Sequence, residues 1–187
     1  MGHDTRAISI HKKLGEMIAL DSQPVSIVED IGFNSFVKVT EPRYTIPSRK
    51  YFSETVIPRI HDEVKAELIK KVHSPGVTAY SFTCDIWSTS TAGLSLLSLT
   101  AHWVVQNFER MLAVLHVMAL QGSHTGMYIA ENFNDMLSNW SISKESVHLV
   151  LRDNASNMER AMKDANVNSF GCFVHSLQLV VHDGVLS

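Results

Sequence analysis

The sequence has little cysteine, no marked excess of one charge and no long uninterrupted apolar run. Its two cysteines, Cys84 and Cys172, are too few for a disulfide scaffold and predict a reducing intracellular compartment. The 16 basic and 19 acidic residues give a net charge of −3, which excludes a chain-wide electrostatic clamp for nucleic acid. The longest mainly apolar stretch, residues 94–105, is interrupted by serine, threonine and histidine and is too short to span a bilayer. We therefore expect no membrane span.

Helical spacing of apolar residues dominates the first 72 residues. With 45% hydrophobic and 19% charged residues, the chain has the composition of a folded globular protein. The spacing predicts three helices, over residues 6–20, 25–38 and 48–72. The pattern stops at the His-Ser-Pro-Gly sequence of residues 73–76, after which a β-rich texture begins. We therefore expect a helical N-terminal segment over residues 1–72 and a second domain over residues 77–187.

The second domain has the element order of a mixed α/β sheet. The expected elements are strands over 80–84, 94–105 and 111–120, a helix over 125–140, a strand over 147–151, a helix over 154–166, a strand over 170–174 and a helix over 176–185. A three-stranded meander followed by a crossover helix and a parallel strand is the order of a ribonuclease-H-like fold. We therefore expect an α/β ribonuclease-H-like core, with a mixed five-stranded sheet and flanking helices, preceded by the α-helical segment and truncated at Ser187.

Two aspartates follow strands that such a fold places side by side. Asp85 and Asp153 are each the first acid after a predicted strand, and the carboxyl ends of parallel neighbours lie at one edge of a sheet. Two carboxylates at one edge repel each other and favour a bound Mg²⁺ or Mn²⁺ ion, which prefers oxygen ligands. The alternative is structural, because aspartate also closes turns and caps helices such as the one expected from Asn154. The spacing alone leaves both interpretations open.

Four segments resemble motifs of one protein family. Residues 82–89 (FTCDIWST) and 151–158 (LRDNASNM) resemble the first and second catalytic-acid motifs of hAT-superfamily transposases. Residues 172–179 (CFVHSLQL) resemble the Cys-x-x-His and Leu-Gln-Leu motif that follows these in the family. Residues 41–49 (EPRYTIPSR) resemble the segment that precedes the core in vertebrate relatives with a BED zinc finger. The chain most resembles the domesticated BED-type zinc-finger proteins derived from hAT transposases.

The resemblance implies a nuclear, DNA-associated protein that forms a homodimer or higher oligomer at full length. Asp85 and Asp153 would be two acids of a DDE triad that uses Mg²⁺ or Mn²⁺. No paired zinc ligands precede residue 72, and the chain stops at Ser187, before the third acid and the C-terminal dimerisation region of the family. We therefore expect no BED finger in this chain and no catalysis from the chain alone.

Two functions are compatible with the resemblance. The first is a domesticated transcription regulator that keeps the ribonuclease-H-like fold as a scaffold, which similarity to the BED-type proteins favours. The alternative is a fragment of an active hAT transposase, which cleaves DNA and transfers strands with the help of metal ions, and the presence of both aspartates favours it.

Further residues near the two acids are candidates for contact with DNA. The resemblance implies that His175 lies near the acids, where it would contact DNA or orient a reacting group, whereas its structural alternative is a histidine at a helix start. Trp87 shares a strand face with Asp85 and would stack on a base, with a core position as the competing interpretation. Cys172 and His175 form only half of a four-ligand zinc site, so no zinc is expected.

A small basic group in the N-terminal segment is a second candidate for contact with DNA. Arg43, Arg49 and Lys50 lie beside tyrosines in the sequence, a combination that suits phosphate binding. The alternative is a solvated loop and helix start.

Overall fold

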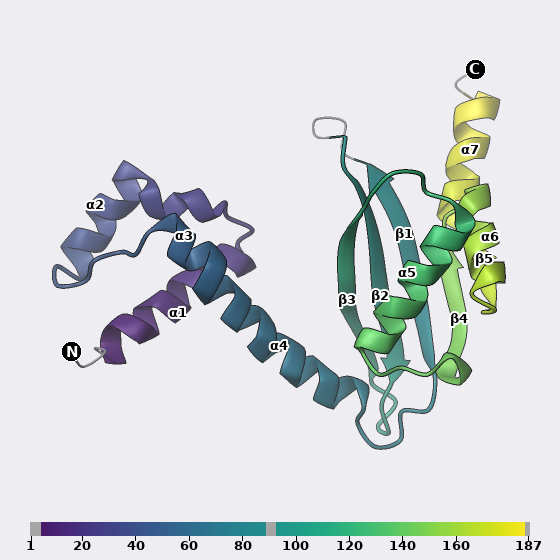
Figure 1. Cartoon of the computed structure of the whole chain (residues 1–187), viewed down its shortest axis with the longest axis horizontal. Helices are drawn as coiled ribbons and strands as arrows, with labels where there is room; N and C mark the ends of the chain where they lie inside the picture. The colour runs from purple at the N-terminus through teal and green to yellow at the C-terminus, as the bar shows by residue number, and fades with distance from the viewer. Residues whose placement is uncertain (1–4, 89–92, 186–187) are drawn as a thin grey trace. The chain divides into compact units, whose positions relative to one another are not determined.

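The computed structural model describes residues 5–88 and 93–185, which form two compact units, Met1–Lys70 and Lys71–Ser187 (Figure 1). In the described part of the chain, no helix combines the length and the apolar character needed to cross a membrane.

The N-terminal unit is helical. Its elements are α1 (Thr5–Leu20), a 3₁₀ turn (Val25–Glu29), α2 (Ile31–Thr40), α3 (Arg49–Tyr51), a π-helical turn (Phe52–Val56) and α4 (Ile57–Val72), which continues into the second unit. The buried side chains of Ile18, Val28, Phe52 and Val56 form its core. Gly15 allows α1 to pack closely, because a Cβ there would lie 2.7 Å from Val56 Cγ1.

The second unit contains a five-stranded mixed sheet with strand order β3-β2-β1-β4-β5 (Figure 1). The strands are β1 (Tyr80–Ser88), β2 (Ser95–Val104), β3 (Arg110–Leu120), β4 (Val147–Arg152) and β5 (Ser169–Gly171). The first three strands form an antiparallel meander, whereas β4 pairs in parallel with both β1 and β5. This sheet confirms the fold class that the sequence predicts.

Helices α5 (Gly126–Asn139) and α6 (Ser156–Asp164) pack together, and α7 (Phe173–Val185) follows β5. Alternate residues of the central strands point into the core beneath α5, where the rings of Phe82 and Phe133 meet edge to face at 6.3 Å. The side chain of Thr125 caps α5 by accepting a hydrogen bond from the N–H of Tyr128. This core supports the carboxyl ends of β1 and β4.

Three predicted boundaries differ from the structure. Strand β1 does not end before Asp85, because its pairing with β2 continues to Ser88. Helix α7 begins at Phe173 rather than at residue 176, and β5 is accordingly shorter than predicted. The helix predicted over residues 25–38 is divided in two by Asp30, whose extended backbone interrupts it.

Candidate functional site at the carboxyl edge of the sheet

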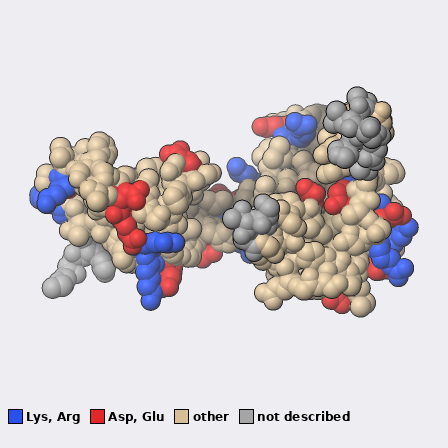
Figure 2. Space-filling view, turned by 90° about the horizontal axis from the view of Figure 1, so that it is seen from above, with Lys and Arg blue, Asp and Glu red and all other residues tan. Residues whose placement is uncertain are grey.

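The two aspartates lie side by side at the carboxyl edge of the parallel pair β1 and β4. Cys84 is paired with Arg152 in the parallel ladder, so the next residues are Asp85 on β1 and Asp153 directly after the end of β4. Adjacent strands lie about 4.8 Å apart, which brings both carboxylates within reach of one small ligand. Figure 2 looks down on this end of the sheet and shows acidic side chains at the surface.

Successive side chains of β1 point to opposite faces of the sheet, and this alternation decides which of them reach this edge. Cys84 points into the core and is buried, whereas Asp85 points to the opposite face and is half-buried. Trp87 is two residues further along on the same face as Asp85, and 41% of its surface is exposed. The structure therefore does not place Trp87 in the core.

A shallow hollow of about 690 Å³ surrounds the two acids. All four residues that the sequence predicts for this site line it, namely Asp85, Asp153, Trp87 and His175. The remaining lining residues are Ile86, Asn154, Ala155 and Gln178. Residues from β1, the turn after β4 and α7 thus form one site.

Asp153 also has a structural role. One of its carboxylate oxygens accepts a hydrogen bond from the N–H of Ala155 at 3.0 Å, and the Arg152 guanidinium donates to its carbonyl oxygen at 2.8 Å. These bonds hold the turn between β4 and α6. Asp153 therefore closes the turn and at the same time lies beside Asp85.

The start of α7 contributes a polarised pair, Cys172 and His175. A hydrogen bond to the Cys172 side chain raises the pKa of His175, and the negative charges of Asp85 and Asp153 act in the same direction. Hydrogen bonds from the backbone and the side chain of His175 lower the pKa of Cys172. The imidazole thus has an increased tendency to carry a positive charge beside the two acids.

The core cysteine behaves in the opposite way. Burial raises the pKa of Cys84 to about 12, with smaller contributions from the charges of Asp153 and Asp85. Cys84 is therefore a neutral packing residue.

Asn154 ties the turn after β4 to the start of α7. Its Nδ2 donates to the carbonyl oxygen of Cys172 at 3.3 Å and to Ser176 Oγ at 2.8 Å. Gly171 leaves room for this contact, because a Cβ there would lie 2.1 Å from Asn154 Oδ1. This arrangement sets where His175 lies relative to Asp153. Neither Asn154 nor Gln178 was predicted from the sequence as a site residue, although Asn154 follows an acid directly and Gln178 is one helical turn after His175.

The donor set fits Mg²⁺ or Mn²⁺ in part. Two carboxylates at one edge supply the oxygen ligands that these ions prefer, and such ions are often held by one or two carboxylates with water and phosphate. Among residues 5–88 and 93–185, no group of three histidine, cysteine or acidic side chains is arranged to hold a metal ion. Asp85 and Asp153 would therefore bind a cation together with oxygen atoms from a ligand.

The basic residues singled out in the sequence lie in the N-terminal unit and do not line this hollow. Arg43 lines a separate hollow of about 510 Å³ together with Arg6 and Tyr44. Arg49 and Lys50 begin α3, where Lys50 is 3.9 Å from Glu54. All three are exposed.

The strand order is that of an RNase-like domain, and the ZBED1 RNase-like domain family matches residues 83–169. The chain is homologous over nearly its whole length to ZBED proteins and to hAT transposases of the Ac type. This finding confirms the resemblance noted in the sequence.

Three relatives illustrate the homology. The chain is 31% identical, over 97% of its length, to zinc finger BED domain-containing protein 4 of Homo sapiens. It is 27% identical over 95% of its length to zinc finger BED domain-containing protein 6 of Mus musculus, and 31% identical over 93% to the putative AC transposase of Zea mays. The chain spans only 16%, 19% and 23% of the lengths of these curated relatives.

Proposed function

We propose that this chain is the RNase-like, DNA-associated part of a transposase-derived nuclear protein that uses the fold as a scaffold for transcription control. The observation that carries the DNA-associated part of the proposal, which the regulator and the transposase share, is the register of β1 and β4, which puts Asp85 and Asp153 at one sheet edge. Similarity to ZBED proteins favours regulation, and the nuclear location and an oligomeric full-length protein rest on the same similarity.

The paired acids bind Mg²⁺ or Mn²⁺ together with phosphate oxygens of DNA. A divalent cation offsets the repulsion between the carboxylates and also allows an anionic backbone to approach them. When bound, the ion supplies positive charge at a phosphate. Asp85 and Asp153 fix the position of the ion, and the backbone of the sheet edge fixes the positions of the two aspartates.

The side chains around the acids suit the rest of a nucleotide. Trp87 presents an exposed ring at the rim, where a base would stack on it. His175 has a raised pKa and donates a charged hydrogen bond to a phosphate oxygen. In the N-terminal unit, Arg43, Arg49 and Lys50 supply further phosphate contacts that are independent of base sequence.

The metal part of the proposal is tested by titrating Mn²⁺ into the isotope-labelled chain and following paramagnetic broadening by NMR. We expect site-specific broadening at residues next to the acids, with millimolar or tighter binding. Asp85→Asn and Asp153→Asn should each weaken binding at least about tenfold, because each removes one of two charged ligands. The control is Asp135→Asn, an exposed acid on α5. Equal effects of all three variants, or no local broadening, would show that there is no such site.

The DNA part is tested by fluorescence anisotropy with a short labelled duplex at several salt concentrations. Arg49→Gln and Lys50→Gln should each reduce the slope of log affinity against log salt by about 1, as expected for the loss of one phosphate contact. Lys70→Gln, on exposed α4, is the matched control. An unchanged slope in both variants would remove these residues from the DNA surface.

The alternative function is that of a hAT DDE transposase, and similarity to the AC transposase together with the adjacent acids favours it. The deciding assay incubates the full-length protein and transposon-end DNA with Mg²⁺. Nicking that is lost in both Asp85→Asn and Asp153→Asn supports the transposase. DNA binding without nicking supports the regulator.

A further inference from the structure

The two edge strands of the sheet differ in length. β3 is 11 residues long and lies at one edge, whereas β5, at the other edge, has three residues (Figure 1). An edge strand presents N–H and C=O groups on the side where it has no neighbouring strand, and these groups pair readily with a further strand. β3 is therefore the long backbone edge of this sheet.

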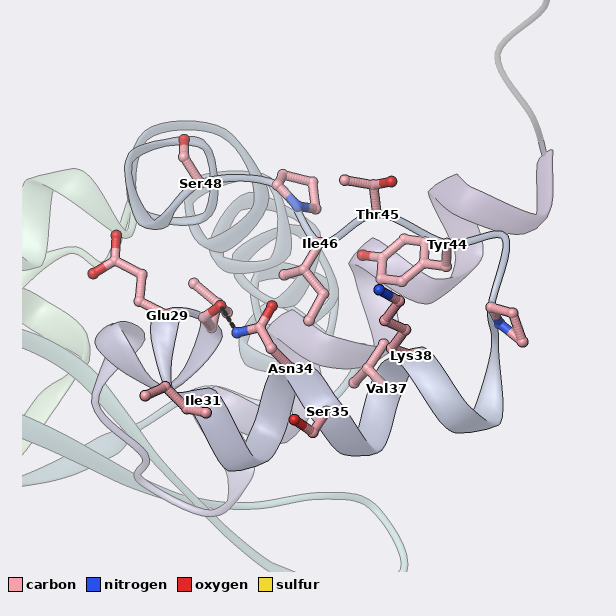
Figure 3. A pocket seen from close by; sticks show the side chains of 13 residues that line it. Glu29, Ile31, Asn34, Ser35, Val37, Lys38, Tyr44, Thr45, Ile46 and Ser48 are labelled. Atoms are coloured by element: carbon pink, nitrogen blue, oxygen red, sulfur yellow. Dashed lines mark hydrogen bonds between the residues drawn. The ribbon is translucent and has the colours of Figure 1, made fainter.

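The N-terminal unit uses its backbone groups internally. Residues 5–70 form helices and turns and contain no strand. Figure 3 shows a groove of about 720 Å³ between α2 and residues 42–48, where Asn34 Nδ2 donates to the carbonyl oxygens of Val28, at 2.8 Å, and Asp30, at 3.0 Å. Even carbonyl groups just before α2 are thus bonded within the unit. The described backbone that is suited to pairing with another chain lies in the sheet.

β3 has few of the features that keep edge strands apart. Proteins protect such edges with charged side chains, proline, bulges or very short strands. Residues 111–120 contain no lysine, arginine, aspartate, glutamate, proline or glycine. The side chains of Leu112 and Val114 are 59% and 57% exposed. The edge therefore combines available backbone groups with exposed apolar side chains.

A bulge divides β3 into two halves. Val114 and His116 pair with consecutive residues of β2, so Leu115 between them is an extra residue. The indole Nε1 of Trp140 donates to the Leu115 carbonyl oxygen at 3.1 Å and holds the bulge in place. Side chains alternate between the two faces within each half, but the extra residue shifts the alternation from one half to the next.

The first half of β3 is complementary to itself. Residues opposite each other in an antiparallel pair have their side chains on the same face. Leu112 and Val114 are exposed on one face, and Ala113 between them is buried on the other. A two-fold axis at Ala113 therefore sets Leu112 of one copy opposite Val114 of the other and matches both faces. Pairing across the bulge would set exposed side chains opposite buried ones.

We propose that residues 111–115 of β3 pair antiparallel with the same residues of a second copy and join two five-stranded sheets about a two-fold axis. The paired segment has no charged residue, so two copies meet without repulsion, and Leu112 and Val114 form two apolar cross-strand pairs. In the second half, residues 116–120, the exposed positions are Val117 and the small Ala119, which favours the first half.

This assembly ends at two copies. Each copy uses its β3 edge, and the edge that remains is the three-residue β5, which is too short to continue a sheet stably. The interface shares no residue with the hollow around Asp85 and Asp153, so it does not depend on the proposed function. A five-residue pairing buries less surface than most stable complexes, so we expect a dissociation constant in the micromolar range.

The first experiment follows sedimentation equilibrium of the whole chain from about 5 to about 200 µM. Wild type should dimerise, and Val114→Lys should weaken the dimer at least about tenfold, because it puts two charges into the paired segment. The matched control is Val64→Lys on α4, 53% exposed, and circular dichroism checks that all chains are folded. A wild-type monomer at every concentration would leave this edge to a different protein, and an equally strong Val114→Lys dimer would use another surface. Either result overturns the proposal.

The second experiment tests the register by disulfide cross-linking with diamide as the oxidant. The background is Cys172→Ser, which removes the more accessible native thiol and leaves the buried Cys84. Opposite residues have Cα atoms about 4.5–5.5 Å apart, within disulfide range, whereas residues two positions out of register are beyond about 7 Å. A mixture of Leu112→Cys and Val114→Cys chains should therefore cross-link at least about fivefold more than either chain alone.

A matched mixture tests the other half of the strand. Val117→Cys and Ala119→Cys chains, in the same background, should give only the cross-linking of random collision. Stronger cross-linking in this mixture would place the contact in the second half of β3. Equal cross-linking in every mixture and in the single chains would show that no register is preferred. Both results contradict the proposed pairing.

Discussion

Substitution of Gly171 by alanine is expected to detach Asn154 from the start of α7. A Cβ at Gly171 would lie 2.1 Å from Asn154 Oδ1, so the Asn154 side chain must rotate away. It then loses its hydrogen bonds to the carbonyl oxygen of Cys172 and to Ser176 Oγ. The turn that carries Asp153 is no longer tied to the helix that carries His175.

The expected magnitude follows from these contacts. Two hydrogen bonds at an exposed position contribute about 1–2 kcal/mol together. Replacing glycine by alanine restores about 0.4–1 kcal/mol by stiffening the unfolded chain. Gly171→Ala should therefore lower the free energy of unfolding by about 1 kcal/mol. In the Asn154→Ala background no amide oxygen lies against the new Cβ. Gly171→Ala should then leave the free energy of unfolding unchanged or raise it by up to about 1 kcal/mol.

The assay is a double-mutant cycle by urea denaturation, followed by circular dichroism. The two effects of Gly171→Ala should differ by about 1–2 kcal/mol. An NMR titration of His175 provides a second measurement, because its raised pKa depends on Cys172 and on the two nearby acids and should fall when α7 is released. Equal destabilisation by Gly171→Ala in both backgrounds would refute the argument, since the cost would then not come from Asn154.

Three further predictions concern single side chains. Tyr44→Phe should raise the free energy of unfolding by about 1 kcal/mol in urea denaturation, because it removes a buried hydroxyl without a partner; a loss of stability would mean that the hydroxyl has one. Burial lowers the pKa of His11 below its ordinary value of 6.5, so the unfolded chain binds more protons and the stability of the N-terminal unit should fall as the pH drops below about 6.5. His11→Gln should flatten that dependence, and an equally steep profile in the variant would contradict it. Iodoacetamide at neutral pH should modify Cys172 and spare Cys84 in peptide mass spectra, with slower modification of Cys172 in His175→Gln; preferential labelling of Cys84 would contradict the pKa shifts of the two thiols.

Local sequence pattern was sufficient for most of the fold. The alternation around Phe82 and Cys84 and the helical spacing around Phe133 are properties of neighbouring residues, and burial of one face selects them directly. The order of these elements predicted the mixed sheet because a parallel strand pair requires a helical crossover. Element ends were less predictable, since β1 extends past Asp85 through its pairing with β2, and the pattern within β1 alone does not specify how far that pairing runs.

Part of the candidate site also follows from the sequence, and part depends on the tertiary structure. The sequence by itself determined that Asp85 and Asp153 end up at one edge, because strand order alone decides which carboxyl ends are neighbours. It left Trp87 open between the core and the rim, and only the tertiary structure placed it at the rim, since the strand continues past Asp85 and leaves 41% of the Trp87 surface exposed. The ties of Asn154 to α7 and the unpartnered hydroxyl of Tyr44 were likewise decided by tertiary structure, because each depends on distances between segments that no local pattern specifies.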